Sequence, residues 1–409
     1  MFKINNNISV AHLSLNLEGG GGVAIKRLHS YLIKQKIKSK IFTYSSSKND
    51  DQIQLFSKSI FNYLYFKLIK KINFLFLYKK NYYSFYYFWK FRINNIEEIM
   101  KLEKFKPTIL IIYNNNSFIN YELIEKLQNK LRFKIIIYPL DMEPLTGGCH
   151  YFWSCENYKN NCVNCPAVSK SLSSYVKKNL EKKKEFYKKV KPTFISGTKN
   201  LDNFIKKASA TKSSTSLSIY TGVDKSIFKN KKIISNKIYI LYRSSYNLRK
   251  GENYLIKTLS KLKNNDSFKS KIVFNLIGKS SLHMFLKENK FLFKNYNHVK
   301  NDMELSKVYQ CSDFYLNTSI QDGGPMMINE ALASGVPVIT FPTQLAKEII
   351  IDKQNGYLIN KNFSEELYLK FIWLAKNNRS QINILKKKTY NFSKIKFDIK
   401  DNIKTIVTI

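Results

Sequence analysis

Two carboxylates stand eight positions apart in the segment 319–341, with a pair of glycines after the first. Gly323 and Gly324 lead into a predicted helix, whose first N–H groups attract an anion such as a diphosphate. Glu330 lies one to two turns into that helix, where a carboxylate can accept two hydrogen bonds from a ribose diol. Asp322 would then face the sugar. The spacing favours binding of a sugar nucleotide. The alternative is that Asp322 only caps the helix and that Glu330 is a solvated helix residue.

The residues around this pair predict the elements that position it. Apolar residues 313–316 predict a strand, and the helix that follows ends near Ser334, because Gly335 is a usual residue just past a helix end. Residues 336–341 return as a buried strand. A further strand is predicted over 238–242, followed by a polar loop and another helix. The carboxylates therefore belong to one strand–helix–strand unit.

The segment resembles the E-x7-E signature of the retaining glycosyltransferases of family 4, also called group 1. Asp322 stands where most members have Glu, which shortens that carboxylate by one methylene. The run from Glu330 to Ile339 is similar to the second carboxylate of the family with its following helix and strand. The resemblance implies that Glu330 holds the ribose and that Asp322 lies near the transferred sugar.

Lys250 and Gly251, after the strand 238–242, resemble the Arg and Lys-Gly element of the same family. The resemblance implies that Lys250 and an arginine neutralise the diphosphate leaving group, by placing fixed positive charge where negative charge develops. Arg249 and Arg243 compete for the second position, because the usual spacing falls on Ser245. The alternative is that these are solvated surface cations.

The amino end predicts a strand over 8–15, a loop of four glycines from Gly19 to Gly22 and an amphipathic helix over 23–34. This order resembles the first loop of the family, where backbone N–H groups approach the donor phosphates. Gly20 and Gly21 are therefore candidates for donor binding. A flexible turn is the alternative interpretation. The nearby His12 and His29 are expected to be structural.

Asp141 and His150 flank a loop that follows the apolar strand 133–138. Catalytic groups in open α/β sheets lie beyond the carboxyl ends of strands. The loop is also similar to a subgroup of family 4 with a Thr-Gly-x-Cys-His segment and a cysteine-rich insertion. Asp141 and His150 are candidates for the acceptor side, where they would position the hydroxyl nucleophile or stabilise charge near the anomeric carbon. His150 could instead be a metal ligand or a packed ring.

Four of the five cysteines fall within seventeen residues: Cys149, Cys155, Cys162 and Cys165. Since no secretory signal is visible, a reducing compartment is expected, and zinc bound by four thiolates is favoured over two disulfides. Such a zinc ion would be structural, because four thiolates leave no open position for water. Cys311 stands apart and is expected to lie in a helix and to pack in the core.

A chain of 409 residues suits two domains, and alternating strands and helices predict a parallel α/β sheet in each. The resemblance implies the GT-B fold, in which two Rossmann-like doubly wound parallel sheets face a cleft. The expected acceptor-side domain covers residues 1–215 with the cysteine-rich insertion at 142–170. The nucleotide-sugar-binding domain covers 216–390, and a C-terminal helix or tail covers 391–409. No metal cofactor is required for catalysis, because cations and helix N-termini supply the stabilisation.

The net charge of +40 would ordinarily suggest polyanionic partners. The lysines are spread throughout and no nucleic-acid motif is visible, so nucleic acid is not an expected partner. Residues 56–95 interleave aromatic residues with Lys, and no apolar run reaches spanning length. They predict an interfacial membrane helix or a cap packed on the first domain. A cytoplasmic location follows, at the inner membrane face if the helix is interfacial.

The resemblance therefore implies a retaining glycosyltransferase that would move a sugar from a nucleotide-sugar donor to a glycan or lipid-linked glycan, in surface polysaccharide biosynthesis. Two other classes stay open. One is another nucleotide-sugar enzyme on the same fold, such as an epimerase, and the other is a zinc-containing basic protein that binds nucleic acid. The donor base, the sugar and the acceptor are not identified by the sequence.

Overall fold

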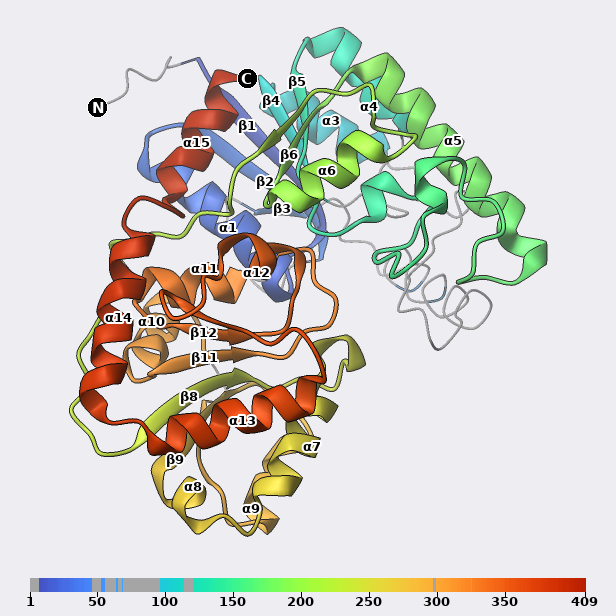
Figure 1. Cartoon of the computed structure of the whole chain (residues 1–409). Helices are drawn as coiled ribbons and strands as arrows, with labels where there is room; N and C mark the ends of the chain where they lie inside the picture. The colour runs from blue at the N-terminus through green and yellow to red at the C-terminus, as the bar shows by residue number, and fades with distance from the viewer. Residues whose placement is uncertain are drawn as a thin grey trace. The chain divides into compact units, whose positions relative to one another are not determined.

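The computed structural model describes residues 7–45, 53–55, 64, 68, 96–113, 121–296, 299–324 and 326–409. The chain forms two compact units, coloured along the sequence in Figure 1. The first unit comprises Met1–Ile219 and Asn402–Ile409, and the second comprises Tyr220–Asp401. The sequence placed this boundary at 215/216. Strand β7 (Ser216–Ser218) still pairs with its neighbour in the first sheet, so the first unit extends to Ile219.

The first unit is built on a seven-stranded sheet with the order β3-β2-β1-β4-β5-β6-β7. Every pairing in it is parallel. Its strands are apolar because both faces of a parallel sheet are covered; the four residues of β4, for example, are all buried. The strands are β1 (Ser9–Asn16), β2 (Lys38–Ser45), β3 (Ile53–Leu55), β4 (Ile109–Ile112), β5 (Lys134–Ile137), β6 (Thr193–Ser196) and β7.

Helices cover both faces of this sheet. One apolar cluster joins the sheet to α1 and α15, and the other joins it to α4, α5 and α6. Ile403 and Ile406 of α15 are buried in the first of these clusters, which is why the end of the chain returns to the first unit. The helices are α1 (Gly19–Lys34), α3 (Ile96–Phe105), α4 (Tyr121–Leu131), α5 (Ser173–Val190), α6 (Lys199–Lys207) and α15 (Ile399–Thr408), with 3-10 turns η2 (Glu143–Leu145), η3 (Asn157–Lys159) and η4 (Lys170–Leu172).

The second unit has a six-stranded parallel sheet with the order β10-β9-β8-β11-β12-β13. Its strands are β8 (Ile238–Arg243), β9 (Ile272–Ile277), β10 (Leu292–Tyr296), β11 (Phe314–Asn317), β12 (Val338–Thr340) and β13 (Gly356–Leu358). Its helices are α7 (Glu252–Leu262), α8 (Asp266–Lys271), α9 (Leu282–Glu288), α10 (Asp302–Gln310), α11 (Met326–Ala333), α12 (Gln344–Ile349), α13 (Phe363–Lys376) and α14 (Arg379–Ser393), with the 3-10 turn η5 (Leu248–Lys250).

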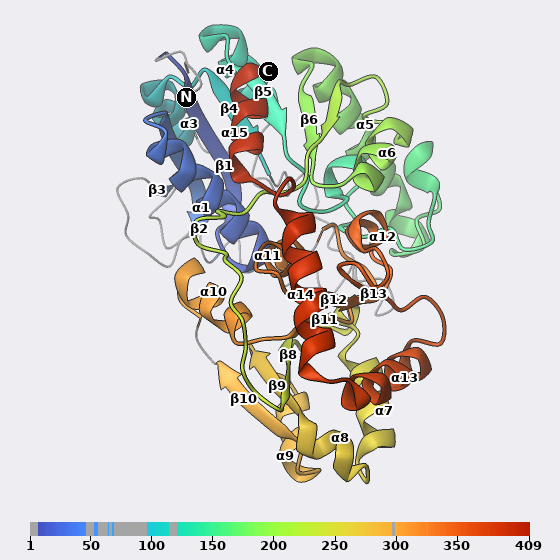
Figure 2. The ribbon, with the colours of Figure 1, turned by 60° about the vertical axis from the view of Figure 1, so that its left-hand side comes forward.

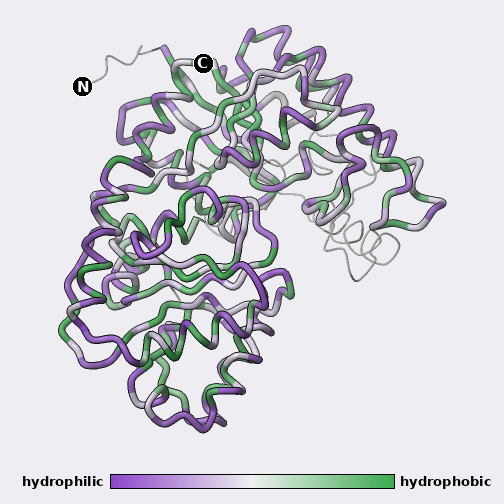
Figure 3. Tube along the Cα trace, in the orientation of Figure 1, coloured by the Kyte–Doolittle hydropathy of each residue, from purple (hydrophilic) through white to green (hydrophobic). Residues whose placement is uncertain are grey.

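Apolar clusters on both faces of the second sheet pack against these helices. In Figures 1 and 2, α8 and α9 lie next to β9 and β10, which they contact. Figure 3 shows apolar residues concentrated along the strands, whereas hydrophilic residues dominate the outer helical turns. The predicted α/β class, with two doubly wound parallel sheets, is confirmed.

The predicted glycine loop from Gly19 to Gly22 is wrong, because these residues form the first turn of α1. The helix begins directly against the end of β1, and the amide of Gly22 donates to the carbonyl of Glu18 (3.2 Å). A Cβ at Gly22 would lie 2.1 Å from the carbonyl carbon and oxygen of Leu17. Glycine is therefore needed for close packing of this turn rather than for a flexible loop.

None of the helices in the described part of the chain combines the length and the apolar character that crossing a bilayer requires. The segment 56–95, for which an interfacial helix or a cap was predicted, lies outside the described residues except for Leu64 and Leu68.

Candidate active site

The loops that follow β8 and β11 meet because these two strands are parallel neighbours, with Phe314 opposite Ile240. The carboxyl ends of parallel neighbours lie at the same edge of a sheet. At this edge Oδ2 of Asp322 is 2.5 Å from Nζ of Lys250 and 3.0 Å from Nη1 of Arg249. The sheet thus brings Asp322 to two other predicted site residues, Arg249 and Lys250, which lie 73 and 72 positions before it in the sequence.

Main-chain contacts fix this cluster. The backbone at Gly251 is left-handed (φ +66°), and a Cβ there would lie 2.1 Å from the carbonyl oxygen of Thr318. Oγ1 of Thr318 donates to the carbonyl of Lys250 (2.7 Å), and the amide of Ile320 donates to the carbonyl of Arg249 (3.0 Å). Only glycine permits this approach, so the turn that carries the cations is held against the loop that carries the carboxylate.

The carboxylate of Asp322 is ionised in this environment. Burial by itself raises the pKa of Asp322, but the charges and hydrogen bonds of Lys250 and Arg249 outweigh it and lower the pKa to about 2. The side chains remain partly accessible, with exposed fractions of 28% for Lys250 and 12% for Asp322. Two cations therefore face one carboxylate at a partly open position, which favours binding of a further anion.

Glu330 is 2% exposed, so the interpretation of this residue as a solvated helix residue is wrong. The hydroxyl of Tyr309 donates to Oε2 of Glu330 (2.8 Å) and is also 3.1 Å from the carbonyl of Met327. Sequence analysis missed Tyr309, which lies at the end of α10 and has no local signal for this contact. The tyrosine holds the carboxylate in one orientation on α11.

The charges of both carboxylates act on the buried Tyr315 of β11. Burial raises the pKa of Tyr315, and the charges of Glu330 and Asp322 raise it further, whereas Arg243 lowers it. Arg243 itself is exposed, and its Nη1 lies 4.0 Å from the sulfur of Met327. Of the two competing arginines, Arg249 is thus the one that contacts Asp322 directly.

The glycines of the signature shape the loop between β11 and α11. Gly324 has a φ of +143°, and its amide lies 3.4 Å from Oδ1 of Asp322. Gly323 is buried beside it. Their predicted role beside the donor diphosphate stays a prediction.

The first unit carries a second charged cluster after β5. Nδ1 of His150 lies 2.5 Å from Oδ2 of Asp141, and both side chains are mostly buried. Burial lowers the pKa of His150, but the charges of Asp141 and Glu143 outweigh it and raise that pKa overall. Burial raises the pKa of Asp141, but His150 outweighs it and lowers that pKa. The two predicted acceptor-side residues therefore form a charged pair.

A buried ion pair that sequence analysis missed supports this loop. Nζ of Lys183 lies 2.5 Å from Oε1 of Glu143, and the two side chains are 4% and 5% exposed. The same ammonium donates to the main-chain carbonyls of Glu143 (2.6 Å) and Thr146 (2.9 Å). Lys183 lies in α5 among several exposed lysines, so the composition of this helix does not indicate that Lys183 is buried. The ion pair ties the loop after β5 to this helix.

The glycines and histidines of the amino end have different surroundings. An added Cβ at Gly20 would meet nothing within 4 Å, whereas one at Gly21 would lie 2.7 Å from Cδ1 of Leu140. Donor binding by Gly20 and Gly21 stays a prediction. Nδ1 of His12 lies 2.9 Å from the hydroxyl of Tyr113, and its Nε2 lies 3.0 Å from Oγ of Ser39. These contacts give His12 a place in the polar interior of the unit.

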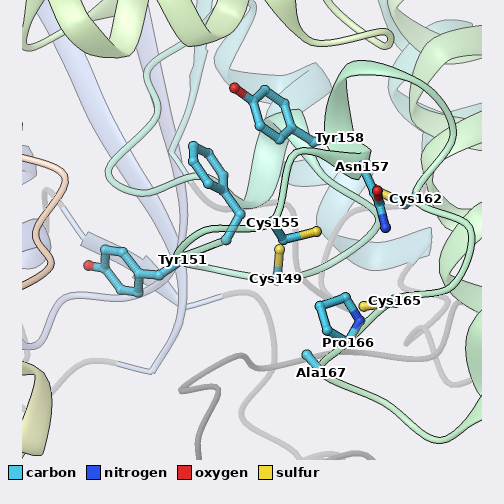
Figure 4. A pocket seen from close by; sticks show the side chains of 10 residues that line it. Cys149, Tyr151, Cys155, Asn157, Tyr158, Cys162, Cys165, Pro166 and Ala167 are labelled. Atoms are coloured by element: carbon cyan, nitrogen blue, oxygen red, sulfur yellow. The ribbon is translucent and has the colours of Figure 1, made fainter.

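The four clustered cysteines line one pocket in the first unit, shown in Figure 4. None of the four forms a disulfide bond. Within the described ranges, no group of three or more His, Cys, Asp or Glu side chains stands in metal-binding geometry. Cys311 is exposed and follows the last residue of α10, so its predicted place in a helix core is wrong. The pocket is lined by Cys149, Tyr151, Phe152, Cys155, Asn157, Tyr158, Cys162, Cys165, Pro166 and Ala167.

Most of the second unit matches a known protein family. Residues 223–392 match the family model of Glycosyl transferases group 1. An uncharacterized glycosyltransferase of Methanocaldococcus jannaschii is 29% identical over 198 residues, which cover 46% of this chain and 50% of that protein. The chain thus spans about half the length of this curated relative.

Two solved structures resemble the whole chain. Sucrose-phosphate synthase from Thermosynechococcus elongatus has a TM-score of 0.67 at 13% identity, over 98% of this chain and 97% of the other. HepE of Anabaena, solved in complex with UDP-glucose, has a TM-score of 0.64 at 12% identity, over 98% of this chain and 99% of the other. These likenesses confirm the predicted GT-B fold. The family model that residues 223–392 of the second unit match describes glycosyltransferases, the class of enzyme that the sequence predicted.

Proposed function

We propose that this chain is a retaining glycosyltransferase that takes a sugar from a UDP-sugar and transfers it to a glycan or lipid-linked glycan. The observation that supports this proposal best is the cluster in which Lys250 and Arg249 both face Asp322. The match of residues 223–392 to Glycosyl transferases group 1 covers all three residues. UDP is the favoured donor nucleotide because a protein of similar fold, HepE, was solved with UDP-glucose.

In the proposed reaction the donor diphosphate replaces Asp322 as the partner of Lys250 and Arg249. The two cations then face the oxygen atoms on which negative charge develops as the sugar–phosphate bond breaks. No proton transfer is needed for this stabilisation, because both side chains are already charged. Asp322, released from the cations, becomes available to the hydroxyl groups of the sugar.

Glu330 is proposed to hold the ribose of the donor. A carboxylate oriented by Tyr309 is suited to accept two hydrogen bonds from a diol without losing side-chain freedom on binding. The Asp141–His150 pair is proposed to act on the acceptor side, where the imidazole would position the attacking hydroxyl. Retention at the anomeric carbon and a role in surface polysaccharide biosynthesis rest on the resemblance of the Asp322–Glu330 segment to its family.

Thermal unfolding with a panel of UDP, GDP and ADP sugars tests the proposal, because a ligand that binds the native state raises its melting temperature. We expect UDP-sugars to stabilise the wild-type protein and to leave the Lys250→Ala and Glu330→Ala variants unchanged. Glu288→Ala, which removes an exposed glutamate of α9, is the matched control and should behave as wild type. Full stabilisation of Lys250→Ala would overturn the assigned site.

The same preparations distinguish the chemistry. With a stabilising donor and a glycan acceptor, NMR of the product should show the anomeric configuration of the donor, whereas the opposite anomer would contradict retention. Conversion of the donor into a different sugar nucleotide without any acceptor would indicate an epimerase. Tight, salt-dependent binding of RNA that survives loss of both carboxylates would indicate a nucleic-acid-binding protein.

A further inference from the structure

Helix α5 lies on the outside of the first unit (Figure 1) and has two unlike sides. Its 18 residues include seven lysines and two glutamates. One side packs on the unit, because Val176, Leu180, Lys183, Phe186, Tyr187 and Val190 are buried. The opposite side carries Glu181, Glu185 and the exposed lysines Lys177, Lys178, Lys182, Lys184, Lys188 and Lys189.

The positive charge of this exposed side is only partly neutralised by neighbouring carboxylates. Six lysines less two glutamates leave an excess of four positive charges on the helix itself. Nζ of Lys177 lies 3.7 Å from Oε1 of Glu181, and Nζ of Lys189 lies 3.1 Å from Oε2 of Glu125 in α4. Exposed ion pairs of this kind hold their partners weakly. The lysines are therefore available to a larger anionic partner.

Exposed apolar side chains lie at the amino end of the same helix. Tyr175 in its first turn is 39% exposed, and Val163 in the preceding connection is 36% exposed. The amide of Cys165 donates to Oγ of Ser173 (3.3 Å), which brings the segment of Val163 to the start of α5. Tyrosine is enriched at the level of the lipid headgroups, where its ring is partly buried and its hydroxyl is hydrated.

We propose that the exposed side of α5, with Tyr175 at its amino end, docks on the surface of a bilayer that contains anionic lipids. Lysine clusters on a helix surface are attracted to such a bilayer, and each lysine near it contributes roughly fivefold in binding. Nucleic acid fits this surface less well, because single strands bind through bases stacked on aromatic rings. Two of the three aromatic side chains of α5, Phe186 and Tyr187, are buried.

The docking surface is tied to the loop that carries the candidate acceptor-side residues. Nζ of Lys183, on the buried side of α5, donates to the carbonyls of Glu143 and Thr146. Both residues lie in the loop between Asp141 and His150. A docked α5 holds this loop near the membrane surface, where a lipid-linked acceptor presents its glycan. This consequence rests on the proposed function, whereas the docking itself does not.

Flotation of the full-length protein with lipid vesicles tests the proposal. We expect the wild-type protein to float with vesicles of phosphatidylcholine and phosphatidylglycerol, but not with vesicles of phosphatidylcholine alone. Salt at about 1 M should release it, because the Debye length is then about 3 Å. Wild-type protein that does not float with the anionic vesicles would overturn the proposal.

A triple variant tests whether α5 is the surface that binds. Lys178→Gln/Lys184→Gln/Lys188→Gln should weaken binding to the anionic vesicles roughly 100-fold. Glutamine has a helix propensity similar to that of lysine, so the exposed helix should keep its fold, which circular dichroism checks.

A second triple variant is the matched control for total charge. Lys257→Gln/Lys387→Gln/Lys388→Gln removes three exposed lysines from α7 and α14 in the second unit and should bind like the wild-type protein. Equal weakening by the two triple variants would show that net charge rather than α5 causes binding, and the assignment of α5 would fall.

Labelled single-stranded RNA distinguishes a bilayer from polyanions in general. If the wild-type protein binds RNA as tightly as anionic vesicles, and the α5 variant loses both equally, the membrane assignment is wrong. None of these measurements contains a donor or an acceptor. Vesicle binding without stabilisation by UDP-sugars would therefore support the docking surface and reject the proposed transferase site.

Discussion

Two charged clusters, one in each unit, differ in the balance of charge and in accessibility. In the second unit Lys250 and Arg249 share one carboxylate, and the lysine is 28% exposed. In the first unit Lys183 and Glu143 form a pair at 4% and 5% exposure, beside the Asp141–His150 pair.

The difference separates a cluster that can exchange its partner from one that cannot. An excess of cations at a partly open edge can accept a diphosphate in place of a side-chain carboxylate. A fully buried ion pair with main-chain hydrogen bonds has no access to an outside ligand, and its charges must stay paired. Substitutions of Lys250 or Arg249 should therefore impair ligand binding, whereas substitutions in the Lys183–Glu143 pair should impair folding.

The largest effect is expected for Lys183→Met, which leaves Glu143 buried without its partner. Breaking a buried ion pair in this way costs about 3–5 kcal/mol. The free energy of unfolding from urea titration should fall by this amount, whereas Lys184→Met, an exposed neighbour in α5, should change little. Equal stability of the two variants would remove the distinction between the clusters.

Next comes Lys250→Ala, which should leave stability nearly unchanged and impair catalysis. Loss of one preorganised charge that faces a developing anion costs roughly 100- to 1000-fold in kcat. The measurement is steady-state transfer from the stabilising UDP-sugar. Lys257→Ala, which removes an exposed lysine of α7, is the control. A Lys250→Ala variant with normal kcat would show that the cluster is structural.

A smaller and opposite change is expected for Asp322→Asn. Because the pKa of Asp322 is about 2, the carboxylate is charged at all pH values at which the protein is assayed, and it competes with a diphosphate for the two cations. Removing its charge should tighten binding of UDP by roughly tenfold, or about 1.4 kcal/mol, while lowering kcat. Calorimetry of UDP binding measures this effect. Weaker UDP binding would show that Asp322 does not compete.

The smallest effect concerns the pH dependence of the Asp141–His150 pair, which contributes roughly 1 kcal/mol. Because the pKa of His150 is raised, its contribution is fully present below the ordinary value of 6.5 and is lost as the pH rises through the raised value. Because the pKa of Asp141 is lowered, its contribution is present above the ordinary value of 3.8 and is lost as the pH falls.

The stability advantage of the wild-type protein over His150→Gln should therefore be largest between pH 3.8 and 6.5 and should shrink above that range. Urea titrations at a series of pH values measure it. An advantage that does not vary with pH would indicate that the ring contributes packing rather than charge.

Local patterns predicted much of the second unit. The strand before Asp322 and the end of α11 before Gly335, which has a φ of +68°, follow from apolar runs and one glycine. The loop predicted from the glycine run of the amino end was wrong. Glycine is needed at position 22 because a Cβ there would clash with the carbonyl of Leu17, and not because the segment forms a loop. Close packing between elements leaves no mark on local periodicity.

The sequence by itself determined the alternation of strands and helices, the spacing of Asp322 and Glu330, and the grouping of four cysteines. Only the tertiary structure decided that Arg249 contacts Asp322, that Tyr309 orients Glu330, and that Lys183 is buried. The physical reason is range. Periodicity and turn residues act over a few positions of the sequence. These partners are far apart in the sequence and meet because β8 is a neighbour of β11 in the sheet and because helices pack against one another and against the sheet.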